Sequence, residues 1–289
     1  MRPSKISSHF AQACGKLSAF FIDLLELNQS DCHMKLQGKR ALVTGGGRGI
    51  GAAICTALAK EGAHVAVNDL RESTETVQAC SALGVRAISA VADVGDQSAV
   101  EAMFDQVEKE LGPIDILVSN AVYSDRELFY KANMEGFEKT IQVCMWGPYY
   151  LARAFANRAI ARQQGGSVVF ISSPHAFSAI PGATAYNMAK AATDQLARTA
   201  AVELAQFRIR VNIIHPGWTN TPGERKFFAE EELSQHGSNL PLGRLAEPRD
   251  IARGVVFLCD PESDYITGST LTIDGGIMLP YQQMFRIKQ

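Results

Sequence analysis

The sequence predicts an α/β fold: a single doubly wound domain with a seven-stranded parallel sheet and helices on both faces. From Lys39 onward, short apolar runs of strand length alternate with helical patterns. Most of these runs are apolar at successive positions, which indicates strands that are covered on both faces by helices. Parallel strands joined through helices take right-handed crossovers, and no interdomain linker or tandem repeat interrupts the alternation.

The elements are expected in the following order. The predicted strands are 40–44, 64–68, 85–92, 115–119, 167–172, 209–214 and 269–273. The predicted helices are 50–60, 72–83, 96–111, a long stretch through Tyr150 and beyond, 184–205 and a helix near 250–258. Thr219–Leu240, here named the lid segment, is richer in Pro, Gly and charge. We expect it to be an insertion or lid over the carboxyl ends of the strands, where ligands bind in this architecture.

Composition excludes several classes of function. The chain has 289 residues, 46% of them apolar and 20% charged, as in ordinary globular proteins. A net charge of −2 gives no reason to expect nucleic acid or a membrane surface as partner, and no apolar stretch approaches the roughly 18 residues of a membrane span. The six cysteines form no Cys-x-x-Cys pair, so we expect no metal site, and scattered thiols suggest a reducing, cytoplasmic location.

The first 33 residues differ from the remainder and are set apart from residues 34–289, which form the predicted domain. Residues 1–20 contain no acidic residue but carry Arg2, Lys5 and Lys16. An organelle transit peptide is therefore one interpretation. A poorly ordered extension is another, and a mis-assigned start is a third, because Met34 begins a plausible natural sequence.

A glycine-rich loop, Thr44–Gly51, joins the first predicted strand to the first helix. Glycine lets the backbone turn sharply and approach phosphates without a Cβ, and the helix N-terminus then offers free N–H groups. A spacing of this kind could be only a tight turn, but its place in a strand–loop–helix unit favours a Rossmann-type dinucleotide site. The residues expected to bind the cofactor here are Thr44, Gly45, Arg48, Gly49, Ile50 and Gly51.

Two charged residues bear on the choice of cofactor. Asp69 ends the second predicted strand, 24 residues after Gly45. A carboxylate there can bind the ribose hydroxyls of NAD and repel the 2′-phosphate of NADP. Arg48 argues the other way, because a guanidinium beside the loop can pair with that phosphate. We expect NAD, with NADP as the alternative.

Ser173, Tyr186 and Lys190 form the predicted catalytic group. Tyr186 and Lys190 are four residues apart and share one face of a predicted helix. The lysine ammonium and a positive nicotinamide ring would favour the phenolate, so that Tyr186 can act as a base. Ser173, at the end of the fifth strand, can hydrogen-bond the substrate oxygen. With the glycine loop, this group indicates a nicotinamide-dependent oxidoreductase, although a lone Tyr-x-x-x-Lys is usually a chance surface pair.

From about Leu36 to Met278 the chain resembles the short-chain dehydrogenase/reductase family. The resemblance rests on Thr44–Gly51, Asp93-Val94, Ser119–Val122, Ser173, Tyr186, Lys190, Asn212, Pro216-Gly217, Thr221, Tyr265–Gly268 and Asp274–Gly276. It implies that Asp93 and Val94 contact adenine, and that Asn120 also belongs to the cofactor site. It further implies that Thr219 and Thr221 help to hold the nicotinamide carboxamide, that Tyr186 and Lys190 contact the cofactor, and that the protein is a homotetramer.

The chain departs from the family pattern at two positions. Cys144 stands where the family usually has an asparagine that supports a water chain to the lysine, and a thiol cannot replace an amide's donor and acceptor. Val122 replaces a glycine near the cofactor and could narrow the nicotinamide side. The water chain can still be held by the backbone carbonyl of Cys144, so we expect reduced rather than absent turnover.

The substrate is indicated only by a softer likeness to the glucose 1-dehydrogenase branch. That likeness rests on Ser172–His175, His215–Pro222 and the ending Asp274–Tyr281. His175 is a candidate to hydrogen-bond a sugar hydroxyl, or is simply a loop histidine satisfied by backbone or water. We therefore expect oxidation of a sugar or similar polar alcohol. The alternatives are a 3-oxoacyl thioester (acyl-carrier-protein) reductase and a nucleotide-binding protein that has lost turnover.

Overall fold

The computed structural model describes residues 34–279 and confirms the predicted doubly wound α/β fold. The extension expected at residues 1–33 lies outside the described residues. All pairings in the seven-stranded sheet are parallel, and the strand order is β3-β2-β1-β4-β5-β6-β7. The strands are β1 (Arg40–Thr44), β2 (His64–Asp69), β3 (Ala87–Val91), β4 (Ile116–Ser119), β5 (Gly166–Ile171), β6 (Ile209–Pro216) and β7 (Thr270–Ile273).

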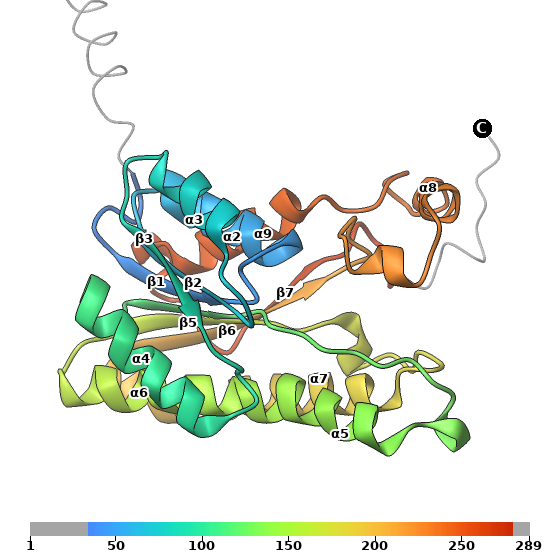
Figure 1. Cartoon of the computed structure of the whole chain (residues 1–289), viewed down its shortest axis with the longest axis horizontal. Helices are drawn as coiled ribbons and strands as arrows, with labels where there is room; N and C mark the ends of the chain where they lie inside the picture. The colour runs from blue at the N-terminus through green and yellow to red at the C-terminus, as the bar shows by residue number, and fades with distance from the viewer. Residues whose placement is uncertain (1–33, 280–289) are drawn as a thin grey trace, which may run out of the picture. The chain divides into compact units, whose positions relative to one another are not determined.

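Helices cover the sheet on both sides. They are α2 (Gly49–Lys60), α3 (Thr74–Ser81), α4 (Gln97–Leu111), α5 (Met134–Ile141), α6 (Gly147–Ala161), α7 (Thr184–Leu204), α8 (Glu230–Ser238) and α9 (Pro248–Cys259). In Figure 1, α2, α3 and α9 lie on one face, and α4, α5, α6 and α7 lie on the other. Helix α8 belongs to the lid segment and stands apart from both layers in the view of Figure 1.

Two hydrophobic cores explain why the strands are apolar at successive positions. Neighbouring residues of one strand point to opposite faces of the sheet. In β1, Leu42 joins the core under α4, α6 and α7, whereas Val43 joins the core under α2 and α9. Phe170 and Ile171 of β5 divide in the same way. Each central strand therefore needs apolar side chains on both faces.

The long helical stretch expected after β4 is present at residues 134–161, and it contains one irregular turn. It is divided into α5 and α6 by a π-helical turn, Gln142–Trp146. A π turn adds a residue to the helical repeat and is often found at functional sites. It places Cys144 against α7, because the Thr193 hydroxyl donates to the Cys144 carbonyl at 2.9 Å. The remaining helix and strand ends lie within a few residues of the expected positions.

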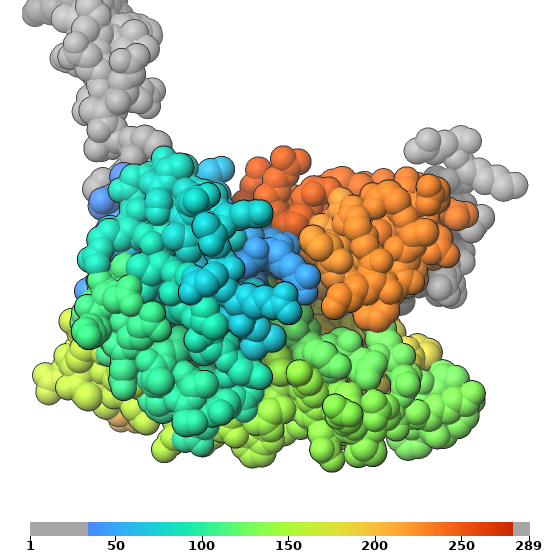
Figure 2. All heavy atoms as spheres, in the orientation of Figure 1, coloured from blue at the N-terminus to red at the C-terminus, as the bar shows by residue number. Residues whose placement is uncertain are grey.

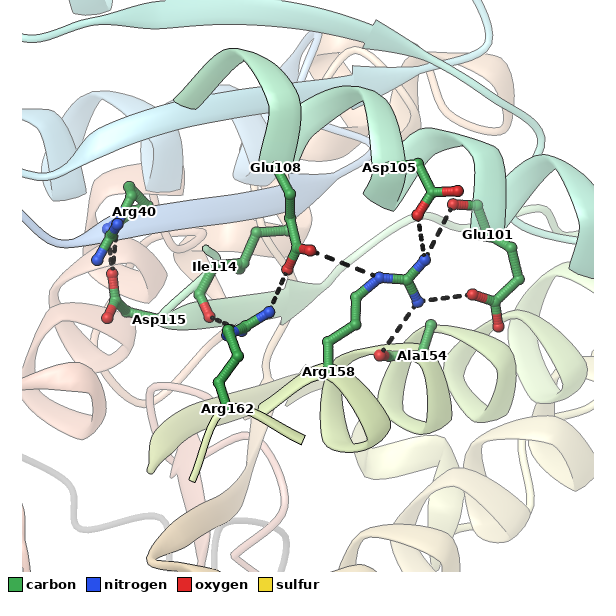
Figure 3. A network of polar contacts seen from close by, with 9 residues as sticks. All are labelled: Arg40, Glu101, Asp105, Glu108, Ile114, Asp115, Ala154, Arg158 and Arg162. Atoms are coloured by element: carbon green, nitrogen blue, oxygen red, sulfur yellow. Dashed lines mark hydrogen bonds and ion pairs between the residues drawn. The ribbon is translucent and has the colours of Figure 1, made fainter. Parts of the chain in front are cut away.

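Arginine side chains join α4 to α6 at the periphery of the domain (Figure 3). Arg158 of α6 donates to Glu101 and Asp105 of α4, both at 2.6 Å, and Arg162 pairs with Glu108 at 2.7 Å. These carboxylates are partly exposed, so screening limits what each pair adds to stability. The network nevertheless fixes the register of the two helices against each other.

The topology creates a crevice at one edge of the sheet. The chain leaves β1 toward β2 on one side and continues from β4 on the other, so the connections diverge between β1 and β4. Ligands bind at such a switch point, beyond the carboxyl ends of the strands. Thr44, Ser119, Ile171 and Pro216, which end β1, β4, β5 and β6, define this edge. Within residues 34–279, no helix is long and apolar enough to cross a membrane.

Candidate active site

The glycine loop, residues 44–51, runs from the end of β1 to the first turn of α2. Arg48 occupies the N-cap position in extended conformation and offers no side-chain cap, and the first turn of α2 has no acidic residue. The leading N–H groups of the helix are therefore not satisfied by a cap, as an anion site requires. Ile50 packs its side chain against the core on the α2 side and fixes the start of the helix.

The loop has no room for side chains at its glycines. A Cβ on Gly51 would lie 2.0 Å from the Gly45 carbonyl oxygen, and one on Gly45 would lie 2.9 Å from the Ala121 Cα. Gly45 and Gly49 also have φ values of +61° and +55°, which favour glycine. A backbone turn this tight, ending at an uncapped helix, fits a dinucleotide pyrophosphate.

Thr44 and Asn120 lock the loop to β4. The Thr44 hydroxyl accepts hydrogen bonds from the backbone N–H groups of Asn120 (2.9 Å) and Ala121 (3.1 Å). The Asn120 amide donates to the carbonyls of Thr44 (2.8 Å) and Gly45 (3.1 Å). Both side chains thus form hydrogen bonds within the loop or between the loop and the end of β4. They therefore stabilise the shape of the proposed cofactor site.

Asp69 stands at the end of β2, beside the glycine loop. Its carboxylate accepts hydrogen bonds from the N–H groups of Gly47 (3.1 Å) and Leu70 (2.8 Å). Arg48 is exposed and forms no ion pair with another described residue. The geometry therefore presents both a carboxylate and a guanidinium at the place expected for the adenosine ribose.

The other predicted cofactor residues lie around the same crevice. Asp93 accepts a hydrogen bond from the Gly95 N–H at 2.8 Å, and Val94 is buried beside it. Thr219 is buried and donates to the Gly217 carbonyl at 3.0 Å. A Cβ on Gly49 would lie 3.5 Å from the Cβ of Thr221, so the start of the lid segment touches the glycine loop.

Ser173, Tyr186 and Lys190 converge where β5 ends and α7 begins. The buried Lys190 ammonium donates to the Ile171 carbonyl at 2.7 Å and lies 5.4 Å from the centroid of the Tyr186 ring. Ser173 is buried, and its hydroxyl is close enough to Tyr186 to act toward a lower pKa of the phenol. The structure thus places together three side chains drawn from two elements.

Within the protein, the pKa of Tyr186 is raised well above its usual value. Burial of the hydroxyl is the main cause, and the Ser173 hydroxyl and the charge of Arg126 act in the opposite direction. Burial also lowers the pKa of Lys190, and the charge of Asp194 acts in the opposite direction. These protein groups therefore do not by themselves produce the phenolate expected from the sequence.

Cys144 contacts α7, the helix that carries Tyr186 and Lys190. Its thiol is buried and donates to the Tyr123 carbonyl at 3.1 Å. Burial raises its pKa, so it is a neutral thiol. Its carbonyl, the expected anchor of a water chain, already accepts a hydrogen bond from Thr193. One lone pair of that carbonyl is left for another donor.

His175 packs edge-on against Tyr186, with ring centroids 5.1 Å apart. Its Nδ1 lies 2.6 Å from the Asn187 Oδ1, which fixes the ring and leaves Nε2 without a hydrogen bond among the described residues. Burial lowers the pKa of His175. A neutral imidazole beside the tyrosine can exchange a hydrogen bond with a substrate hydroxyl.

Two residues on the substrate side were not predicted from the sequence. Arg126 and Glu224 both act on the charge of Tyr186, although they lie about a hundred residues apart in the chain. Glu224 accepts from the Trp218 indole N–H at 2.9 Å. Neither residue lies in a periodic pattern or a motif, so only the tertiary structure could reveal them. Figure 2 shows the orange lid segment facing the green segment after β4.

A separate cavity of about 290 Å³ lies between the residues that flank the lid segment, the start of α9 and the end of β7. Trp218, Leu242, Arg244 and Asp274 contribute to its lining, but Ser173, Tyr186 and Lys190 do not. This cavity is therefore not the site built around Tyr186. The predicted catalytic residues lie instead beyond the end of β5, where Lys190 contacts the Ile171 carbonyl.

Comparison with known proteins identifies the family. Residues 45–278 match the family described as enoyl-(acyl carrier protein) reductase. L-rhamnose 1-dehydrogenase (NAD(P)(+)) of a Sphingomonas species is 33% identical over 86% of this chain and 99% of its own length. The 3-oxoacyl-[acyl-carrier-protein] reductase FabG of Haemophilus influenzae is 35% identical over 84% of this chain and its full length.

A solved structure agrees with the two relatives. A putative 2-deoxy-D-gluconate 3-dehydrogenase from Agrobacterium tumefaciens, with bound NADP, superposes with a TM-score of 0.78. It is 30% identical, and the match covers 85% of this chain and 98% of the other. The family match, the two relatives and the shared fold point the same way. The chain belongs to the short-chain dehydrogenase/reductase family, nicotinamide-dependent oxidoreductases that act on alcohols or carbonyl compounds.

Proposed function

We propose that the protein oxidises a hydroxyl of a sugar or similar polar alcohol, with Tyr186 as the base. The convergence of Ser173, Tyr186 and Lys190, at the same edge of the sheet as the glycine loop, carries this proposal. The neutral His175 next to Tyr186 supports a substrate rich in hydroxyl groups. The likeness to the rhamnose dehydrogenase supports a sugar as substrate. We place the protein nearest to the glucose 1-dehydrogenase branch of the family.

Each side chain has a defined role in this proposal. Ser173 hydrogen-bonds the substrate oxygen and holds it next to the Tyr186 hydroxyl. Tyr186 takes the hydroxyl proton during oxidation and returns it during reduction. Lys190, held by the Ile171 carbonyl, supplies a fixed positive charge near the phenol ring. When bound, the nicotinamide ring accepts or supplies the hydride.

The proposed cofactor is NAD, held by the glycine loop, Asp69, Asp93, Val94, Asn120, Thr219 and Thr221. Asp69 supports NAD, because a carboxylate beside the ribose repels a 2′-phosphate. NADP is the alternative, supported by the exposed Arg48 and by the NADP-bound relative of known structure.

A second candidate function is reduction of a 3-oxoacyl thioester on acyl-carrier protein. The relative from Haemophilus influenzae favours it. A basic patch near the crevice would support it further. In the lid segment, however, Arg225 is paired with Glu230 at 2.9 Å, and Glu224 also faces the site. A third candidate, a nucleotide-binding protein without turnover, is motivated by Cys144 and Val122.

We also propose a homotetramer that packs through α5, α6, α7 and β7. Trp146 and Tyr149, at the start of α6, are each 42% exposed although they are large and apolar. Tyr265, just before β7, is fully exposed. Burial of these aromatic residues in an interface would explain their exposure in one chain. The scattered thiols support a cytoplasmic location for the assembly.

An initial-rate assay tests the proposed function. Purified protein is offered D-glucose for oxidation and a 3-oxoacyl ester for reduction, each with NAD(H) and NADP(H). We expect sugar-dependent reduction of NAD that rises with pH, because the raised pKa of Tyr186 leaves little phenolate at neutral pH. Tyr186→Phe should lower this rate at least about 1,000-fold while cofactor binding persists.

The outcomes separate the candidates. Oxoacyl reduction alone would favour the second candidate function. Cofactor binding without turnover of any alcohol or ketone would favour the third. Full activity in the Tyr186→Phe variant would overturn the catalytic assignment itself.

A further inference from the structure

An arginine that forms no hydrogen bond or ion pair with another described residue stands on the substrate side of the crevice. Arg126 lies on the segment between β4 and α5, here named the β4–α5 loop (residues 120–133). Its guanidinium carbon lies 4.2 Å from the centroid of the Phe227 ring in the lid segment. Stacking on an aromatic ring covers one face of a guanidinium but leaves the N–H groups at its edge available.

The carboxylates nearest in sequence to Arg126 are committed elsewhere. The Asp125 carboxylate packs so closely on Gly136 of α5 that a Cβ there would overlap it. Glu127 accepts a hydrogen bond from the Asn133 N–H. Within residues 34–279, Arg126 itself forms neither an ion pair nor a hydrogen bond. Its five N–H donors are thus available to an acceptor from outside these residues.

Arg126 also lies close enough to the reactive hydroxyl to influence it. Its charge acts to lower the pKa of both Tyr186 and His175. Glu224 acts on Tyr186 in the opposite direction, but its carboxylate is held by Trp218 and does not pair with Arg126. A ligand between the β4–α5 loop and the lid segment would therefore meet the Arg126 guanidinium, the carboxylate of Glu224 and the hydroxyl of Tyr186.

We propose that Arg126 binds a carboxylate on the substrate, so that the preferred alcohol is a hydroxy acid, such as a sugar acid, rather than a neutral sugar. A planar guanidinium matches a carboxylate with two parallel hydrogen bonds, and the Phe227 ring orients it in advance. The carboxylate takes no part in the hydride or proton transfer and serves to position the hydroxyl. The oxidation of the hydroxy acid rests on the proposed function. Binding of its carboxylate by Arg126 does not.

Matched pairs of alcohols test the inference. D-gluconate and D-glucitol differ mainly in a carboxylate at one end of the same polyol chain, as do 3-hydroxybutyrate and 1,3-butanediol. We expect kcat/KM for one acid to exceed that for its neutral partner at least tenfold. Arg126→Gln should lower the value for the acid by 10- to 100-fold and change that for the neutral alcohol by less than threefold. Arg126→Lys should restore part of the difference.

Lys131→Gln provides the matched control. Lys131 lies on the same loop and also stacks on an aromatic ring, with its ammonium 5.6 Å from the Tyr130 centroid. It is not among the groups that shift the pKa of Tyr186. Its removal should leave the acid-to-neutral ratio unchanged.

Calorimetry of the same acids with NADH-loaded protein separates this inference from the proposed function. Binding of an acid that Arg126→Gln abolishes, without turnover of any alcohol, would sustain the inference while the proposed reaction fails. Turnover of neutral alcohols without preference for an acid would sustain the reaction and overturn the inference. Equal losses for acid and neutral partner in Arg126→Gln would also overturn it, since Arg126 would then only join the loop to the lid segment.

Discussion

The glycine loop and the lid segment face the same crevice but are built in different ways. The glycine loop is eight consecutive residues whose shape is set by backbone crowding, with Gly51 against the Gly45 carbonyl. The substrate side is assembled from the β4–α5 loop, the turn that carries His175, and the lid segment, which are far apart in sequence. Its contacts are made by exposed side chains such as Arg126 and Phe227.

This difference suggests that the glycine loop serves a cofactor common to the family, whereas the exposed loops select the substrate of each member. A backbone cradle tolerates almost no substitution, so it binds one kind of ligand. Side chains on exposed loops can change without cost to the core, so they can define a particular substrate. We therefore expect substitutions on the cofactor side to affect every substrate equally, and those on the substrate side to change the ratio between substrates.

Gly51→Ala should have the largest effect on the cofactor side. The added Cβ would lie 2.0 Å from the Gly45 carbonyl oxygen and 2.7 Å from the Asn120 amide nitrogen, so the loop must move. We expect cofactor affinity to fall by roughly 100-fold or more, about 2.7 kcal/mol. Fluorescence titration with NADH on folded protein measures this loss.

Gly84→Ala is the control for that substitution. Gly84 has a φ of +84°, and no atom lies within 4 Å of the position that an added methyl group would take, so alanine there adds backbone strain but no clash. It should lower the melting temperature slightly and leave NADH affinity unchanged. Normal affinity in a folded Gly51→Ala variant would show that the loop is not the rigid cradle described above.

Asp69→Ser should have the next largest effect, and it sharpens the comparison within the cofactor side. Removing the carboxylate removes its repulsion of a 2′-phosphate and leaves Arg48 free to attract one. We expect the NADP-to-NAD ratio of kcat/KM to rise by about 10- to 100-fold, or 1.4 to 2.7 kcal/mol. Initial rates with the two cofactors measure it.

The matched control for Asp69→Ser is Asp96→Ser. Asp96 caps α4 by accepting from the Ser98 N–H at 2.8 Å, and the hydrogen bonds from Ser98 and Ala99 lower its pKa. Asp96→Ser makes the same substitution at a residue that stabilises a helix. The NADP-to-NAD ratio of kcat/KM should therefore stay unchanged. An unchanged ratio in Asp69→Ser would show that Asp69 serves only the turn at Gly47.

The contrast between the two sides also explains what could be predicted from the sequence. Successive apolar residues such as Leu42 and Val43 reveal the two-faced sheet directly, because each face has its own core. Ser173, Tyr186 and Lys190 lie at recognisable spacings, and the fold brings them together. Arg126 and Phe227 have no such spacing, since their contact depends on how two distant loops meet.

The π turn escaped prediction for a related reason. Residues 134–161 have a continuous helical pattern, and the extra residue that divides α5 from α6 has no compositional sign. Its effect appears only in three dimensions, where the Cys144 carbonyl accepts from Thr193 of α7. Likewise, the burial that raises the pKa of Tyr186 depends on surrounding elements that a local motif does not contain.

Cys144→Asn should have the smallest effect on activity. It tests whether Cys144 affects all substrates equally or changes the ratio between them. The thiol of Cys144 donates only to the Tyr123 carbonyl, whereas an amide in its place could also accept a hydrogen bond near Lys190. We expect kcat to rise by about two- to tenfold for every substrate, with the ratio between acid and neutral alcohols unchanged. A gain confined to one substrate would place Cys144 on the substrate side.

Cys144→Ser distinguishes the amide from a general effect of polarity. A hydroxyl keeps the approximate size of the thiol and its donor, but it lacks the amide's separate acceptor and reach. Because Cys144 is buried, the larger asparagine must also be accommodated, and thermal unfolding reports any overpacking. If a stable Cys144→Asn variant turned over no faster than Cys144→Ser, the departure at this position would not limit the rate. The π turn would then act on α7 through its backbone alone, where the Cys144 carbonyl accepts from Thr193, a property of the fold and not of the residue it carries.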